Sequence, residues 1–147
     1  SEYLELIHGV VAGRPSIDLD LEIAVQRACR KLVSSGVVNS AHDCSDGGLA
    51  VALAECALAG GVGAEITAPI TGRWDAALFG EGQSRILVSL SSDCLANLDE
   101  ICAAEGVPYL VIGRVSGADL AFGDLLNVPV SQLAEVHADG LASELQR

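Results

Sequence analysis

The chain has 147 residues with a formal net charge of −12; half of its residues are hydrophobic and only 3% are aromatic. This length suits one compact domain, whose core must be built mainly from Ala, Val, Leu and Ile. The acidic charge argues against nucleic acid and against an anionic membrane surface as partners. No apolar run is long enough to span a bilayer.

Five cysteines are present and none forms a C-x-x-C pair: Cys29, Cys44, Cys56, Cys94 and Cys102. An odd number of cysteines without a signal peptide predicts a reducing, cytoplasmic location. Methionine is absent even from position 1, so either an initiator was removed or the chain is a piece of a longer protein.

The first half of the chain predicts an arm followed by a helix, a strand and a second helix. Residues 1–16 contain a Gly-rich stretch and are predicted to be an interdomain linker or arm with one short helical turn at 3–7. Residues 18–35 carry apolar side chains at helical spacing, begin with Asp18 and end at Gly36, which predicts a helix. Residues 37–42 are a strand candidate that leads through a Gly-rich turn into a helix at 49–59.

The second half mixes the two element types. Strands are predicted at 63–66, 85–90 and 108–115, with 119–122 returning as the hairpin partner of the last and 128–130 extended. Helices are predicted at 74–78 and 93–104, and a final one capped by Ser131 runs through residue 145. This order predicts an α+β domain over residues 17–147, with a mixed β-sheet covered by helices in three α/β/α layers.

The first candidate site is the run Ala-His-Asp-Cys-Ser-Asp-Gly-Gly-Leu at residues 41–49. A strand that enters a helix through a Gly-rich turn leaves backbone N–H groups free to bind an anion such as phosphate. Gly47 and Gly48 would let a ligand approach the backbone, while Ser45 and Asp46 offer hydrogen bonds. A plain helix cap explains the same spacing about equally well.

Two further side chains in this run, His42 and Cys44, each have a functional and a structural interpretation. His42 could contact substrate or act as an acid or base, but a histidine that orients the loop is slightly favoured. Cys44 stands near a helix start, which would lower its pKa, yet a small buried apolar residue is favoured about three to one.

The second candidate site is Phe-Gly-Glu-Gly-Gln-Ser-Arg at residues 79–85. It gathers a carboxylate, an amide, a hydroxyl and a guanidinium between a helix and a strand. The alternative is a solvated loop with an ion pair between Glu81 and Arg85. Neither metal-ligand spacing nor a Walker A or Rossmann pattern is visible.

Both motifs resemble phosphoribosylformylglycinamidine synthase. The family carries S-A-H-D-x-S-D-G-G-L-A-V-A-L-A-E, as here at residues 40–55, and a segment like Leu-Phe-Gly-Glu-Gly-Gln-Ser-Arg at 78–85. The Val-Ile-Gly-Arg-Val run at 111–115 also matches, and the resemblance covers nearly the whole chain. It favours a fragment of a longer enzyme with the fold of the C-terminal domain in the aminoimidazole ribonucleotide (AIR) synthetase-like superfamily.

The resemblance implies an ATP-dependent ligase that amidates formylglycinamide ribonucleotide with ammonia from glutamine. ATP and Mg²⁺ would be held mainly by an N-terminal-type domain of the same polypeptide. A glutaminase subunit and a small accessory subunit would be further partners. Without the N-terminal-type domain the chain is expected to be inactive alone, and its exposed apolar surface is expected to promote self-association.

Carried over by position, the resemblance implies a ligand or phosphate site formed by His42, Asp43, Ser45, Asp46, Gly47 and Gly48. The facing cleft wall would be Glu81, Gln83 and Ser84. The cleft could be catalytic or could hold a structural nucleotide, and a catalytic base is not identified. Alternatives are a non-catalytic interface domain or another member of the same ATP-dependent superfamily.

Overall fold

The computed structural model describes residues 1–13 and 16–144, without the side chains of 141–144. The chain divides into two compact units, Ser1–Ala52 with Ile70–Leu110, and Leu53–Pro69 with Val111–Arg147. Both candidate motifs belong to the first unit. The helix that follows the first motif begins in the first unit, and its later turns are assigned to the second.

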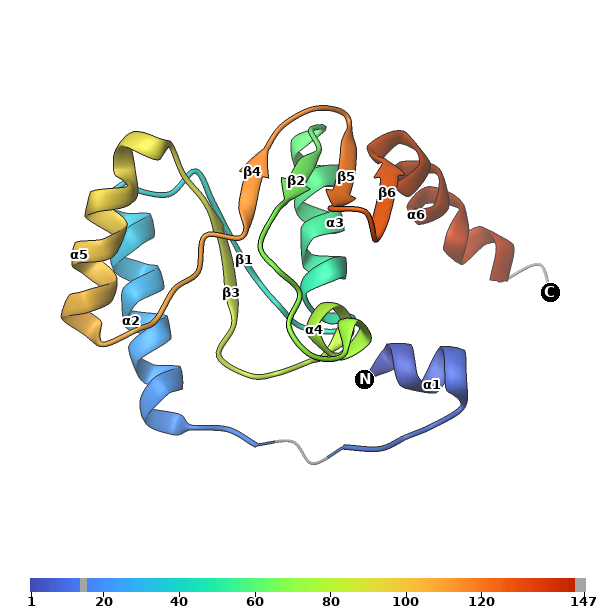
Figure 1. Cartoon of the computed structure of the whole chain (residues 1–147), viewed down its shortest axis with the longest axis horizontal. Coiled ribbons are helices and arrows are strands. Elements are labelled where there is room, and N and C mark those ends of the chain that lie inside the picture. The colour runs from blue at the N-terminus through green and yellow to red at the C-terminus, as the bar shows by residue number, and fades with distance from the viewer. Residues whose placement is uncertain (14–15, 145–147) are drawn as a thin grey trace. The chain divides into compact units, whose positions relative to one another are not determined.

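The first unit combines helices with a two-stranded antiparallel sheet (Figure 1). Strands β1 (Ser40–Asp43) and β3 (Ile86–Ser89) pair with each other. The helices are α1 (Glu2–His8), α2 (Leu19–Ser34), α4 (Trp74–Phe79), the 3₁₀ turn η1 (Ser92–Cys94) and α5 (Leu95–Glu105), together with the first turn of α3 (Gly48–Gly60).

Helices α2 and α5 lie side by side and bury the core of this unit (Figure 1). That core contains Leu32, Val37, Leu98 and Cys102, each at most 9% exposed. The start of α2 is set as the sequence predicts, because an Asp18 carboxylate oxygen accepts the N–H groups of Asp20 and Leu21 at 3.0 and 3.1 Å.

The second unit contains a four-stranded mixed sheet and two helical segments. Its strands are β2 (Ala64–Ile66), β4 (Gly113–Val115), β5 (Asp119–Phe122) and β6 (Leu126–Pro129), in the spatial order β4-β2-β5-β6. The remainder of α3 and helix α6 (Val130–Glu144) belong to the same unit. The predicted α+β class with a mixed sheet is confirmed, although the strands divide over two sheets.

The predicted hairpin between 108–115 and 119–122 is wrong. Strand β2 lies between β4 and β5, pairing antiparallel with β4 and parallel with β5. The connection between them crosses the start of β2, where the Gly63 N–H donates to the Gly117 carbonyl at 2.9 Å and Ser116 N–H donates to the Gly63 carbonyl at 3.0 Å. The true hairpin is β5 with β6.

Several element boundaries also differ from the sequence prediction. The strand predicted at 108–115 forms only at Gly113–Val115, and the strand predicted at 37–42 is Ser40–Asp43. Val37 instead packs in the α2–α5 core. Helix α6 already begins at Val130, so Ser131 lies inside its first turn rather than at its cap, and residue 145 lies outside the described residues. Among the described residues, none of the helices is both long and apolar enough to cross a membrane.

Gly48 and Gly36 allow a matched test of packing against backbone strain. Both have left-handed backbones, with φ of +66° and +69°. A Cβ on Gly36 meets open space, whereas one on Gly48 would stand 2.6 Å from the Gly80 carbonyl oxygen. We expect Gly36→Ala to lower the free energy of unfolding by about 1–2 kcal/mol. Gly48→Ala should cost about 1–3 kcal/mol more, because backbone must move. Urea denaturation measures both, and equal losses would contradict the packing argument.

Candidate functional site

Strand pairing brings the two candidate motifs to the same end of the small sheet. β1 and β3 run antiparallel with Asp43 opposite Ile86, so the end of β1 meets the start of β3. One residue further, the Cys44 N–H donates to the Arg85 carbonyl at 3.0 Å. The turn after β1 and the loop before β3 are therefore neighbours, as the two-wall site requires.

The two glycines of the first motif are buried against protein. A Cβ on Gly48 would lie 2.6–2.9 Å from backbone atoms of Leu78, Phe79 and Gly80. A Cβ on Gly47, whose φ is +75°, would lie 2.3 Å from a methyl group of Val51. Packing at the start of α3 thus accounts for both glycines, and their ligand role stays a prediction.

Glu81 joins the second motif to the first. Its Oε1 accepts the Gly47 N–H at 3.2 Å and the Glu2 N–H at 2.8 Å. The hydrogen bond from the Glu2 backbone and, after it, that from the Gly47 backbone lower the pKa of Glu81 below its ordinary value, against a partial desolvation that raises it. One N–H of the predicted anion-binding turn is thus occupied by a carboxylate of the protein itself.

The remaining polar side chains of the first motif form local hydrogen bonds or are exposed. Ser45 Oγ donates to the Asp43 carboxylate, and this hydrogen bond is the main cause that lowers the pKa of Asp43. His42 Nδ1 lies 2.6 Å from the Asp43 carbonyl oxygen, consistent with a histidine that orients the loop. The side chain of Asp43 is 74% exposed, and Ser45 and Asp46 are exposed as well.

Cys44 follows the structural rather than the reactive interpretation, and Arg85 does not form the ion pair with Glu81 that was the alternative for the second motif. Cys44 is half-buried, and desolvation raises the pKa of its thiol, which disfavours a nucleophilic thiolate. The Arg85 guanidinium donates to the Gly80 carbonyl at 3.0 Å, and no ion pair between Arg85 and Glu81 is found among the described residues. The second motif is therefore a loop closed on itself, not one bridged by that pair.

Ser84 and Gln83 complete the second wall, and Ser84 has a partner that sequence reasoning missed. Ser84 Oγ donates to Glu22 Oε2 at 2.6 Å, and the Gln26 amide donates to Glu22 Oε1 at 2.7 Å. These hydrogen bonds, that from Ser84 first, lower the pKa of Glu22. Gln83 is exposed. In the sequence, Glu22 looks like an ordinary first-turn acid of α2, so nothing local marks it.

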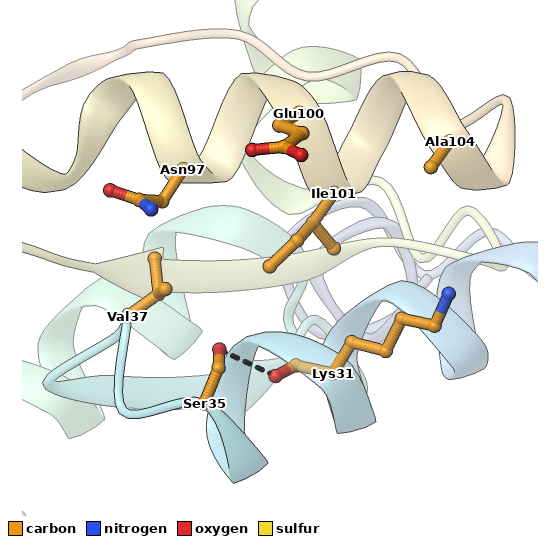
Figure 2. A pocket seen from close by; sticks show the side chains of 7 residues that line it. All are labelled: Lys31, Ser35, Val37, Asn97, Glu100, Ile101 and Ala104. Atoms are coloured by element: carbon orange, nitrogen blue, oxygen red, sulfur yellow. Dashed lines mark hydrogen bonds between the residues drawn. The ribbon is translucent and has the colours of Figure 1, made fainter.

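A separate hollow of about 390 Å³ lies between α2 and α5 (Figure 2). Its lining residues are Lys31, Ser35, Val37, Asn97, Glu100, Ile101 and Ala104. None of them belongs to the two motifs. Ser35 Oγ donates to the Lys31 carbonyl at 2.7 Å within the C-terminal end of α2, and the Lys31 ammonium pairs with Glu105 at the end of α5.

The described residues do not fit a metal centre. Within residues 1–13 and 16–140, no three His, Cys, Asp or Glu side chains gather in a way that could hold a metal ion.

The lowered pKa of Glu81 predicts a pH dependence of stability. A carboxyl group with a lower pKa in the folded state stabilises the fold above its ordinary pKa of 4.5, and this contribution is lost as pH falls through the folded value. Glu81→Gln should therefore be less stable than the parent chain at neutral pH, and the difference should narrow below about pH 4.5. Thermal midpoints measured over this range test it. Glu100→Gln, an exposed helical control, should leave the pH dependence of the thermal midpoint unchanged. A midpoint for Glu81→Gln that stays equally far below that of the parent chain at every pH would contradict the expectation.

The comparisons with known proteins agree with the resemblance found in the sequence. The chain is 44% identical to phosphoribosylformylglycinamidine synthase subunit PurL of Anaeromyxobacter sp. (strain Fw109-5) over 158 residues, covering 100% of this chain and 21% of the relative. It is 43% identical to the subunit of the same name from Synechocystis sp. (strain ATCC 27184 / PCC 6803 / Kazusa), covering 99% and 20%. The chain thus spans about a fifth of the length of these relatives.

Solved structures and a family model give the same result. T. maritima PurL complexed with AMPPCP matches with a TM-score of 0.69 at 25% identity, covering 84% of this chain and 24% of that one. T. maritima PurL complexed with FGAR matches with a TM-score of 0.66 at 25% identity, covering 77% and 21%. The family model described as AIR synthase related protein, C-terminal domain, matches residues 2–123, which is well over half of the chain. The chain therefore belongs to the AIR synthase related family, of which it represents the C-terminal domain.

Proposed function

We propose that the chain is the C-terminal-type domain of a phosphoribosylformylglycinamidine synthase, a cytoplasmic ligase of purine biosynthesis. The enzyme would amidate formylglycinamide ribonucleotide, using ATP and ammonia from glutamine. Support comes from relatives of that name aligned along the whole chain, and from related structures described as complexes with FGAR, ATP and ADP. Residues 1–16 would form the arm that leads into a domain at 17–147.

The observation that carries the site proposal is the contact between the two motifs. Glu81 accepts the Gly47 N–H at 3.2 Å, which supports residues 42–48 and 81–84 as two adjoining walls of one site. We infer that His42, Asp43, Ser45, Asp46, Gly47 and Gly48 contact substrate or its phosphate. Glu81, Gln83 and Ser84 would shape the facing wall.

The charges of these walls support a site that is completed by another domain. Asp43, Asp46 and Glu81 are carboxylates, and the Arg85 guanidinium is engaged with the Gly80 carbonyl. A ligand phosphate beside them needs positive charge from elsewhere. In this proposal the N-terminal-type domain holds most of the ATP and Mg²⁺, so the isolated domain is inactive.

Partner domains and subunits complete the proposed enzyme. Large apolar side chains are exposed at several places on the first unit, among them Leu6, Ile7, Val11 and Leu110, which supports partners that cover them. The N-terminal-type domain would cover them in the enzyme, and self-association would do so in the isolated chain. A glutaminase and a small accessory subunit are further proposed partners; one structure of the same fold is described as PurLQS from Thermotoga maritima.

A second candidate function is a non-catalytic domain that forms an interdomain interface or holds a structural nucleotide. The Gly47 N–H is already bound by Glu81, which leaves the turn one donor short as an anion site. This observation favours the helix-cap interpretation of the turn. Ligand titration separates the two functions.

Calorimetric titration with formylglycinamide ribonucleotide tests the proposal on the intact synthetase and on this chain alone. The intact enzyme should bind, and Asp46→Ala should weaken binding about tenfold, because a hydrogen bond at a charged group is lost. The isolated chain should bind at least about 100-fold more weakly, since it presents half of a site.

Asp93→Ala, an exposed acid on η1, is the matched control and should bind like the parent enzyme. Equal affinity of the isolated chain and the intact enzyme would refute the half-site argument. Unchanged binding by Asp46→Ala would remove the turn from the substrate site and favour the interface function.

A further inference from the structure

Ser84 has an unusual backbone for a residue with a side chain. Its φ is +61°, and among the described residues it is the one non-glycine with a positive φ. This left-handed conformation costs free energy for an L-residue and persists only where the surroundings hold it. Such residues concentrate at ligand-binding sites.

Glu22 is the group that holds Ser84. Its Oε2 accepts the Ser84 hydroxyl at 2.6 Å across 62 positions of sequence. Its other oxygen accepts the Gln26 amide one helical turn away at 2.7 Å, so both carboxylate oxygens are engaged. Glu22 is itself half-buried in the first turn of α2, which limits where its side chain can go.

The loop at residues 81–85 is also held by two hydrogen bonds to the first motif. Glu81 binds the Gly47 N–H, and the Arg85 carbonyl accepts the Cys44 N–H. Gln83 remains exposed between these attachments, next to the strained backbone of Ser84. The backbone of Gln83 therefore lies between two held neighbours, Glu81 and Ser84.

We propose that Glu22 is a positioning residue for ribonucleotide binding: by holding Ser84 it fixes the loop that presents Gln83 to the ligand. Glu22 does not touch the ligand in this proposal. The inference rests on the proposed function, since it assumes that residues 81–84 form a wall of the substrate site.

Steady-state amidation by the intact synthetase tests the inference. Glu22→Ala and Ser84→Ala should each raise the KM for formylglycinamide ribonucleotide about tenfold, the change expected for losing one charge-assisted hydrogen bond. The kcat and the KM for ATP should stay within about twofold, because the chemistry and the nucleotide site are not altered. The double variant should be no worse than either single one, since both remove the same contact.

Two further variants separate positioning from general stability. Glu22→Gln keeps an oxygen acceptor for Ser84 and should restore the KM to within about threefold of the parent enzyme. Glu100→Ala, an exposed helical glutamate on α5, should behave like the parent. Additive effects in the double variant, an unchanged ribonucleotide KM, or equal increases in both KM values would overturn the inference. A parent enzyme that fails to amidate the ribonucleotide would instead refute the proposed function itself.

Discussion

The close approach between Gly48 and the chain leaving α4 is the contact on which the candidate site depends. A Cβ at Gly48 would stand 2.6 Å from the Gly80 carbonyl oxygen and 2.9 Å from that of Leu78. Both obstacles are backbone atoms, so no rotamer change could relieve the clash. The fold therefore requires a glycine here whether or not a ligand ever approaches, and the start of α3 is held directly against the second loop.

That approach makes the other contacts of the site possible. With the two segments adjacent, the Glu81 carboxylate reaches the Gly47 N–H, and the Cys44 N–H reaches the Arg85 carbonyl. Helix α3 thereby receives a negative charge near its N-terminus from a loop more than thirty residues away, which suits the helix dipole. Local turn chemistry and long-range pairing therefore act together at both motifs.

The sequence predicts what depends on neighbouring residues and misses what depends on distant ones. The Asp18 cap and the stop of α2 at Gly36 follow from local capping rules, and both are confirmed. The placement of β2 between β4 and β5 does not, because strands of three or four residues carry too little pattern to choose their partners. The contact between Glu22 and Ser84 was missed for the same reason, since neither residue is unusual within its own segment.

Charge decides how this site can work. The two walls carry the carboxylates of Asp43, Asp46 and Glu81 in a chain whose net charge is −12. A phosphate dianion placed among them is repelled unless cations from another source offset the repulsion. Hydroxyl and amide groups of a ligand, by contrast, find suitable acceptors here. In the proposed function, this domain would orient the neutral part of a substrate while a facing domain would provide the positive charge, so the site would depend on its partner.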